Sequence, residues 1–543
     1  MNNLEIAQAA KLRPIADVAA EAGLIDADFE PLGRFKAKLT TEGIARLKQN
    51  GKRGKLILVS AITPTTKGEG KTTVTIGLSQ GLNKNARAIS ATREPALGPI
   101  FGVKGGACGG GYSQVLPMED INLFFTGDFP AITAAHNLLS AMLDAHVHHG
   151  NALGIDLKTE RWPRTLDMND RALRSVITSL GGATNGPARE GSFVITPASE
   201  IMAILCLSRS LADLKENLGN IVAAVNTSGA PVTARDLKAD GAMTALLRDA
   251  IRPNLVQTIE GGLAFVHGGP FGNIAHGCSS ILATECALGL ADYVVTEAGF
   301  ASDLGAEKFL NIVCPRLGYG PDAIVLVASI KALAHHGEGN LEAGLPNLFR
   351  HLSHLQAYGP KVVVAINRFA DDTDEDHDIV KSACAARGVL AVTCNPFGGG
   401  GEGCLELAEA VATAASEPST FTPAYTETQT IEEKLTAIVQ KVYGGNGVVF
   451  EGTSRKDLSW LKKHGYADLP VCVAKTQYSF SDDAARTNAP TGFDLHVKGL
   501  RASAGAGFLV VTCGEIMLMP GLGKAPTAQQ IDVDADGRIT GHF

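Results

Sequence analysis

The chain has 543 residues, of which 45% are hydrophobic and 19% charged, with 61 glycines and a formal net charge of −8. This length is enough for several domains, and the negative charge argues against binding nucleic acid or an anionic membrane surface. The ten cysteines form no Cys-x-x-Cys pair, no apolar run is long enough to span a membrane, and the first residues do not resemble a signal peptide, so we expect a cytoplasmic protein with reduced thiols.

Residues 1–54 are predicted to be mainly helical. A short amphipathic helix is expected to begin at Ile15 and to end at Gly23, and a second is expected from Lys36 to Leu47. The basic turn that follows leads into the run Leu56–Ile62, which is rich in β-branched and leucine side chains and predicts a buried strand.

A glycine-bearing turn after this strand is typical of a phosphate-binding loop. Gly68 and Gly70 allow successive backbone N–H groups to converge on phosphate oxygens at the N-terminus of the next helix. We expect Lys71 to reach the β- and γ-phosphates and Thr72 to ligate Mg²⁺. The alternative is a glycine-rich turn with a surface lysine, because Thr65 stands where the usual pattern has its first glycine.

The nucleotide-binding residues predicted from this loop are Thr65, Thr66, Lys67, Gly68, Glu69, Gly70, Lys71 and Thr72. The next strand, Ala86–Ala91, leads to Arg93, which is expected near the phosphates if the two strands are neighbours, because ligands lie beyond the carboxyl ends of strands in such sheets. A surface ion pair of Arg93 with Glu94 is the alternative.

Strands continue to alternate with helices along the chain, at residues 292–297, 323–329, 361–366 and 389–393. This alternation predicts an α/β fold with a mainly parallel, doubly wound sheet of the P-loop NTPase type and two smaller α/β domains. The polar stretch at 414–428 suggests a boundary. The predicted domains are a nucleotide-binding catalytic domain at 1–365, an α/β domain at 366–425 and a C-terminal α/β domain at 426–543.

Nearly the whole chain resembles the formate–tetrahydrofolate ligase family. The motifs that support the resemblance are Phe35-Lys-Ala-Lys, Thr63-Pro-Thr with Gly68-Glu-Gly-Lys-Thr-Thr, Arg93-Glu-Pro, Thr126-Gly-Asp, Gly269-Pro-Phe, Asn367-x-Phe, Gly400-Gly-Glu-Gly, Gly505-Ala-Gly-Phe and Met519-Pro-Gly-Leu. So many blocks in one order are more specific than the phosphate loop alone.

The resemblance implies that formate attacks the γ-phosphate of Mg-ATP to give formyl phosphate and ADP. The N10 amine of tetrahydrofolate, including its polyglutamylated form, would then attack the formyl carbon and release phosphate. Both steps develop negative charge on oxygen atoms, and Lys71 and Arg93 are the catalytic cations suited to stabilise it. Gly507 and Phe508 would cover the adenine, and the family suggests a homotetramer.

A flat pterin needs aromatic faces, and the family places two aromatic side chains at positions that match Phe369 and Phe397. The domain at 366–425 would therefore lie on the folate side. Glu94 and Asp128 match motif carboxylates that would bind a monovalent cation such as K⁺ or NH₄⁺.

Three positions depart from the family pattern: Phe397 replaces a common tryptophan, Pro130 a usual histidine, and Gly523 a usual proline. Two other functions compete with the ligase. One is a nucleotide-switched ATPase, which would need no formate or folate. The other is a folate-binding protein that has lost catalysis, which would bind folate without turnover.

Overall fold

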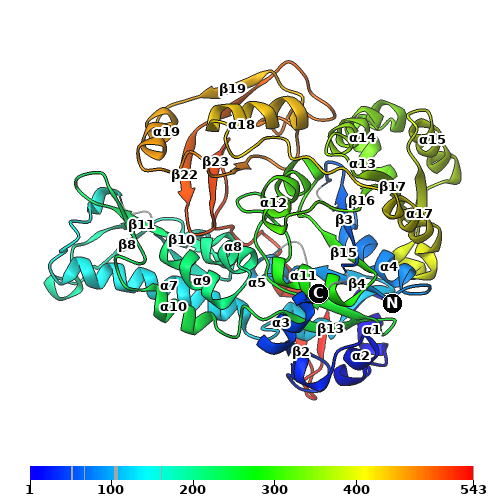
Figure 1. The fold of residues 1–543 in the computed structure, drawn as a ribbon, viewed down its shortest axis with the longest axis horizontal. Helices are drawn as coiled ribbons and strands as arrows, with labels where there is room; N and C mark the ends of the chain where they lie inside the picture. The colour runs from blue at the N-terminus through cyan, green and yellow to red at the C-terminus, as the bar shows by residue number, and fades with distance from the viewer. Residues whose placement is uncertain (50–52, 66–67, 103–107, 160–161, 542–543) are drawn as a thin grey trace.

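A large, mostly parallel β-sheet organises the protein (Figure 1). The computed structural model describes residues 1–543 except 50–52, 66–67, 103–107, 160–161 and 542–543. Within the described residues this sheet has twelve strands, and its main path runs β1-β2-β13-β14-β4-β15-β3-β16-β17-β18. Every neighbouring pair from β14 to β18 is parallel, whereas β1, β2 and β13 form an antiparallel edge.

The strands of the main path have the following bounds: β1 Phe29–Pro31, β2 Ala37–Leu39, β3 Lys55–Ala61, β4 Ala88–Thr92, β13 Asn254–Thr258, β14 Leu263–Val266, β15 Tyr293–Glu297, β16 Ala323–Ala328, β17 Lys361–Asn367 and β18 Ala391–Cys394. The short strands β5 (Gly109–Gly110) and β6 (Ser113–Leu116) attach to β13.

Helices cover both faces of the parallel part of the sheet. Side chains alternate along β3, so Ile57 and Val59 join a core with α4 (Lys71–Leu82) and α17 (Leu405–Ser416). Leu56 and Leu58 join the larger core on the other face, which is covered by α11 (Ile281–Leu290), α13 (Ile330–His336) and α14 (Leu341–Gln356). The expected doubly wound α/β arrangement is therefore present.

Two further groups of elements flank the sheet (Figure 1). The first is helical and contains α7 (Asp128–His148), α8 (Glu200–Leu207), α9 (Leu211–Gly219) and α10 (Asp240–Leu247). The second is C-terminal and contains α18 (Ile431–Ile438), α19 (Ser454–Lys463) and the three-stranded sheet of β20 (Val471–Ala474), β23 (Phe508–Thr512) and β22 (Gly499–Ser503). The expected domain boundary at 365/366 falls within β17, and the next strand, β18, pairs with β17 in the large sheet. The division into domains stays a prediction.

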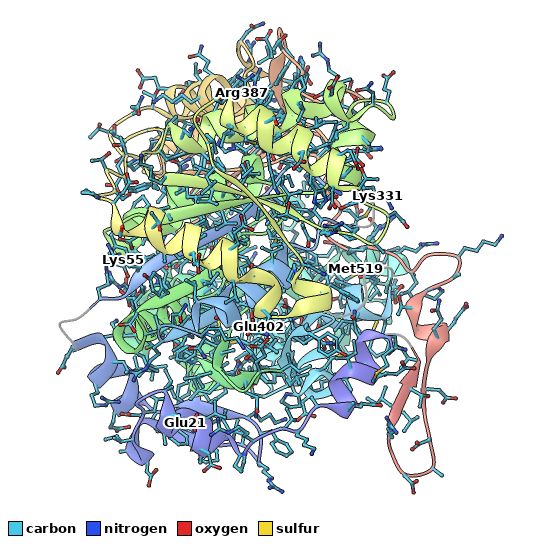
Figure 2. The ribbon with its side chains drawn as sticks, turned by 90° about the vertical axis from the view of Figure 1, so that its right-hand side faces the viewer. Glu21, Lys55, Lys331, Arg387, Glu402 and Met519 are labelled. Carbon is cyan, nitrogen blue, oxygen red and sulfur yellow. The ribbon has the colours of Figure 1, made fainter. Side chains whose placement is uncertain are left out.

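The chain ends in a hairpin of β24 (Ile531–Val533) and β25 (Ile539–Gly541), which stands at one edge of the molecule in Figure 2. Among the described residues, no helix combines the length and the apolar character needed to cross a bilayer.

The prediction of a helix from Lys36 to Leu47 was wrong for its first half. Residues 37–39 form β2, which pairs with β1 and β13, and α3 begins only at Thr41 and ends at Gln49. Tertiary pairing explains the difference, because the side chains of Ala37 and Leu39 are fully buried against the sheet.

A buried ion pair joins this N-terminal strand to the start of α7. The Lys38 ammonium lies 2.8 and 3.1 Å from the carboxylate oxygens of Asp128 and also donates to the carbonyl of Arg252 at 2.9 Å. Asn254 donates to the same carboxylate at 2.8 Å. Both charged side chains are almost inaccessible, 3% and 2% exposed, so neither charge can be hydrated if the other is lost.

We therefore expect Lys38→Met to lower the free energy of unfolding by about 3–5 kcal/mol, because it leaves the Asp128 carboxylate buried and unpaired. Urea-induced unfolding measures this change, and adding Asp128→Asn should recover much of the loss. Lys462→Met is the matched control, since Lys462 pairs with Glu432 at 2.6 Å on the surface and should cost less than about 1 kcal/mol. Equal effects of the two single substitutions would contradict the role of the buried pair.

Candidate active site

The loop between β3 and α4 turns sharply onto the N-terminus of the helix. Gly68 and Gly70 have positive φ angles of 75° and 70°, and Gly70 is the N-cap of α4 with no capping side chain among the described residues. A Cβ atom on Gly70 would lie 2.4 Å from the Nδ2 atom of Asn367, so a larger residue does not fit without a shift. The first N–H groups of α4 have no acceptor within the helix and are suited to bind an anion.

Glu69 holds this loop in place from inside. Its Oε1 atom accepts the backbone N–H of Thr65 at 2.7 Å, and its other carboxylate oxygen accepts the hydroxyl of Ser329. The Asn367 amide donates to the Glu69 carbonyl at 3.0 Å. The Glu69 side chain is therefore occupied within the protein. Thr66 and Lys67, which were predicted in the same loop, lie outside the described residues.

Lys71 and Thr72, the first two residues of α4, contact the end of β15 and the loop that follows it. The Lys71 ammonium donates to the carbonyl of Phe300 at 2.8 Å, and the Thr72 hydroxyl donates to Glu297 Oε2 at 2.9 Å. β15 pairs with β3 through Glu297 and Val59, which brings the carboxyl ends of both strands to the same edge of the sheet.

Arg93 follows β4, which is not the direct neighbour of β3, because β15 lies between the two strands. Its guanidinium nevertheless reaches this edge, with Nη2 at 3.8 Å from Glu297 Oε1 and Nη1 donating to the Pro270 carbonyl at 3.3 Å. Lys71, Thr72 and Arg93 thus contact the end of β15 or the loop that follows it, so the structure brings these three predicted site residues together.

Glu297 was missed by the sequence analysis, which assigned no role to it. The side chain is 4% exposed, yet it contacts both Thr72 and Arg93. The available signal was an acidic residue at the carboxyl end of an otherwise apolar strand, where a buried charge is costly unless it is paired.

Glu94 and Asp128 lie in the same buried region, but Asp128 is already paired with Lys38. The backbone N–H of Glu94 donates to the Gly268 carbonyl at 2.7 Å. Burial and the nearby Asp128 carboxylate raise the pKa of Glu94 above its usual range. Glu94 Oε2 has no hydrogen-bond partner among the described residues, so a polar group or cation could be accommodated there.

Phe369 and Phe397 follow β17 and β18, which are adjacent parallel strands. The two phenylalanine side chains are 41% and 50% exposed, which is unusual for large apolar rings and suits a contact surface. Asn367, which touches the phosphate loop, lies two residues before Phe369. The ring of Phe397 packs close to Gly110, because a Cβ atom added to that glycine would lie 3.4 Å from the ring.

The turn at Gly505–Gly507 is held by two charged side chains. Glu200 Oε1 accepts the N–H groups of Gly505 and Ala506 at 2.8 and 3.3 Å, and Arg316 Nη2 donates to the carbonyls of Ala506 and Gly507 at 2.6 and 3.1 Å. Burial raises the pKa of Glu200 to about 7. Phe508 is only 1% exposed and packs in the core; nucleotide binding by Gly507 and Phe508 stays a prediction.

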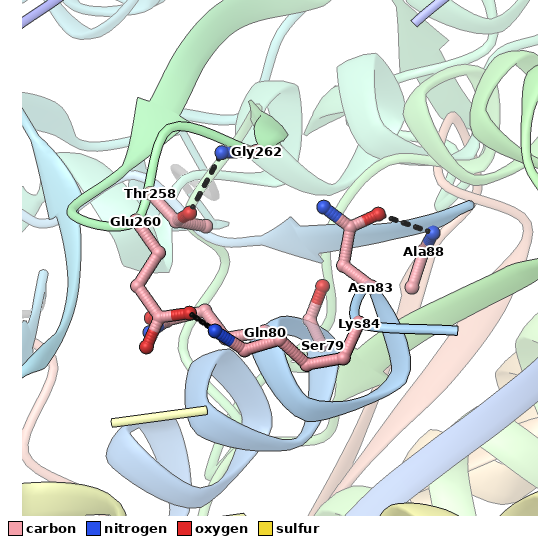
Figure 3. Close-up of a pocket in the computed structure, with 8 residues that line it drawn as sticks. All are labelled: Ser79, Gln80, Asn83, Lys84, Ala88, Thr258, Glu260 and Gly262. Carbon is pink, nitrogen blue, oxygen red and sulfur yellow. Dashed lines mark hydrogen bonds and ion pairs between the residues drawn. The ribbon is translucent and has the colours of Figure 1, made fainter. Parts of the chain in front are cut away.

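A cavity of about 140 Å³ lies at the far end of α4 from the phosphate loop (Figure 3). Its lining includes Asn83, Lys84 and Glu260, and the Lys84 ammonium pairs with Glu260 at 2.9 Å. Because none of the predicted site residues lines this cavity, we assign it no part in the site.

Comparison with known proteins shows what the whole chain is similar to. The sequence model of the formate–tetrahydrofolate ligase family matches residues 1–543. A formate–tetrahydrofolate ligase of Symbiobacterium thermophilum is 52% identical over 556 aligned residues, which cover 100% of this chain and 100% of the relative. The similarity therefore extends over every element described above.

Proposed function

Because this chain belongs to the formate–tetrahydrofolate ligase family, it catalyses the ATP-dependent ligation of formate to tetrahydrofolate, and we propose that the reaction passes through formyl phosphate at the edge formed by β3, β15 and β4. The observation that supports this site best is that Thr72 and Arg93 both contact Glu297, while Lys71 binds the Phe300 carbonyl three residues further along. A P-loop NTPase-like mode of ATP binding is part of the proposal.

The chemistry requires an activated formate, since a carboxylate does not react with an amine. In the first step a formate oxygen attacks the γ-phosphorus and ADP leaves. In the second, N10 attacks the formyl carbon, phosphate leaves, and the nitrogen loses its proton. Lys71 and Arg93 are already held by carbonyl and carboxylate oxygens, so little reorganisation is needed to stabilise the developing negative charge.

Mg²⁺ fits the chemistry of this site. The Thr72 hydroxyl and the Glu297 carboxylate lie 2.9 Å apart and both offer oxygen ligands. Mg²⁺ usually takes only one or two protein ligands beside phosphate and water. When bound, the ion would neutralise phosphate charge. In the described part of the chain, no cluster of three or more metal-ligating side chains competes for it.

Glu94 Oε2 has no hydrogen-bond partner in the described part of the chain, which supports the proposed monovalent cation at Glu94 and Asp128, although the Lys38 ammonium already neutralises Asp128. The pterin is proposed to lie between Phe369 and Phe397. A homotetrameric assembly, a cytoplasmic location and the use of polyglutamylated tetrahydrofolate stay predictions from the resemblance and the composition.

We expect Lys71→Ala to abolish ADP formation from formate and Mg-ATP, because the ammonium at the phosphate loop is lost, while tetrahydrofolate binding is retained. A coupled ADP assay and calorimetric titration with tetrahydrofolate measure the two effects. Lys331→Ala, which removes an exposed lysine on α13, is the control and should leave both unchanged. Loss of folate binding in Lys71→Ala would show that the lysine is misassigned, and folate binding without turnover by the unmodified protein would indicate lost catalysis.

Glu297→Gln should raise the Mg²⁺ concentration needed for half-maximal activity by roughly 10–100-fold, the usual effect of removing a carboxylate that orients a metal site. Titration of Mg²⁺ at fixed ATP measures the shift. Glu297→Asp is the conservative control because it keeps the charge and should show a smaller shift. An unchanged Mg²⁺ requirement in Glu297→Gln would argue against a metal role for this carboxylate.

Phe397→Ala should raise the KM for tetrahydrofolate roughly 2- to 12-fold with little change in kcat, since a lost ring contact is worth about 0.5–1.5 kcal/mol. Phe397→Trp should lower this KM because it offers a larger face. Steady-state kinetics with varied tetrahydrofolate distinguish these outcomes, and identical KM values in all three proteins would remove Phe397 from the folate site.

A further inference from the structure

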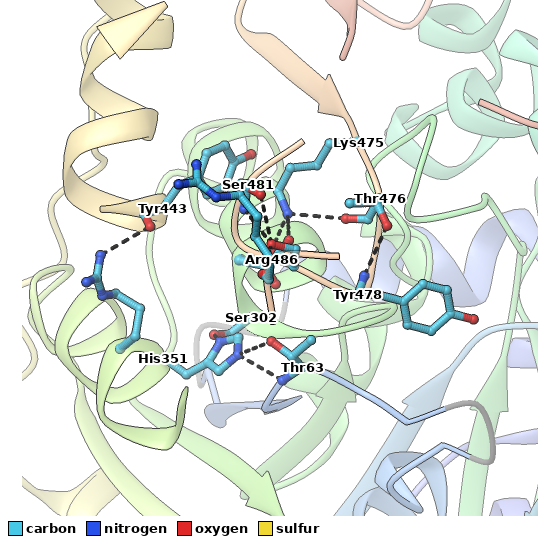
Figure 4. Close-up of polar contacts among 12 residues, drawn as sticks. Thr63, Ser302, His351, Tyr443, Lys475, Thr476, Tyr478, Ser481 and Arg486 are labelled. Atoms are coloured by element: carbon cyan, nitrogen blue, oxygen red, sulfur yellow. Dashed lines mark hydrogen bonds and ion pairs between the residues drawn. The ribbon is translucent and has the colours of Figure 1, made fainter. Parts of the chain in front are cut away.

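Thr63, at the entry to the phosphate loop, has all its polar atoms bound by side chains of α13 and α14 (Figure 4 shows part of this contact). Its backbone N–H donates to His351 Nε2 at 2.8 Å, and its hydroxyl lies 2.9 Å from the same nitrogen. Asn347 donates to this hydroxyl at 3.1 Å, and His336 Nε2 donates to the Thr63 carbonyl at 3.0 Å. Thr63, which enters the loop, is therefore fixed at each of its own hydrogen-bonding groups.

The hydrogen bonds define the protonation state of His351. Since Nε2 accepts a backbone N–H, it carries no proton, and the neutral ring must be protonated on Nδ1. That nitrogen donates to the Ser302 hydroxyl at 2.7 Å, and Ser302 in turn donates to His354 Nε2 at 2.6 Å. Burial, with smaller effects of His336, Lys475 and Arg350, keeps the pKa of His351 well below its usual range, which agrees with a neutral ring.

Ser302 connects His351 to the opposite wall of the candidate active site. It lies two residues after Phe300, whose carbonyl accepts the Lys71 ammonium. The next residue, Asp303, is bound by the buried Lys475 ammonium at 2.7 Å, so the C-terminal group of elements also holds this turn. His351 itself packs on the ring of Phe480 with a centroid separation of 4.4 Å.

We propose that His351 is a positioning residue for phosphoryl transfer. It joins Thr63, before the phosphate loop, to Ser302, beside the loop that holds Lys71, and so sets the spacing of the two walls between which the phosphates bind. His351 does not touch the reacting atoms and acts through these two contacts. The inference rests on the proposed function of the phosphate loop.

The test compares His351→Phe, which removes the hydrogen bonds to Thr63 and to Ser302 but keeps a ring on Phe480, with His351→Gln, whose amide oxygen can still accept from Thr63. His136→Phe is the matched control. His136 is also a buried ring with two hydrogen bonds, to Ser199 and Pro163 at 2.8 Å each, and it stacks on Trp162 at 4.3 Å, but it lies on α7. Thermal unfolding reports any general loss of stability in each variant.

We expect His351→Phe to lower kcat by at least about tenfold, because small displacements of catalytic groups have large effects on rate. The KM for tetrahydrofolate should stay unchanged, and the Kd for Mg-ADP should rise. The proposal holds if the loss of kcat exceeds that of His351→Gln and of His136→Phe by at least about threefold, and is overturned otherwise.

Two further measurements keep the test decisive. If His351→Phe does not fold, Ser302→Ala replaces it, with Ser140→Ala on α7 as its control and the same threefold criterion. If the unmodified protein does not ligate formate, the proposed function fails. The Mg-ADP affinities then still decide the positioning role, which is overturned if His351→Phe and His136→Phe bind Mg-ADP equally well.

Discussion

The position of β15 between β3 and β4 is the constraint on which the active site depends. Parallel pairing on both sides of β15 brings the carboxyl ends of β3, β15 and β4 to one edge of the sheet. Glu297, at the end of β15, then contacts Thr72 in the helix after β3 and Arg93 directly after β4. One buried carboxylate is thus placed between the Thr72 hydroxyl and the Arg93 guanidinium. With strands in another order, these side chains would not meet.

Compensated buried charges and neutral buried histidines tie distant segments to this sheet. Lys38 with Asp128 and Lys475 with Asp303 each connect an outer group of elements to the centre. Such pairs add little net stability compared with apolar contacts, but breaking one of them is costly. Their value here is geometric, since each charge accepts only one arrangement of its neighbours.

The phosphate loop also links the proposed nucleotide and folate sides of the site. Asn367 binds the Glu69 carbonyl and would have to shift if Gly70 carried a side chain, and the exposed Phe369 lies two residues further along. A displacement of the loop would therefore also displace Asn367 at the end of β17. This coupling is suited to the proposed route, in which an intermediate formed at the phosphates would reach a second substrate without exposure to water.

The sequence by itself determined the local features: the strand, the glycine turn and the helix of the phosphate loop, and the alternation that predicts a parallel sheet. These follow from backbone conformation and side-chain periodicity within a few residues. The family resemblance further identified Phe369 and Phe397 as a candidate pair.

Only the tertiary structure decided the strand order, the conversion of residues 37–39 from an expected helix to β2, and the contacts of Glu297 and His351. The reason is sequence distance: Thr72 meets Glu297 across 225 residues and Thr63 meets His351 across 288. No local pattern specifies such contacts, because they exist only once the sheet has brought the segments together.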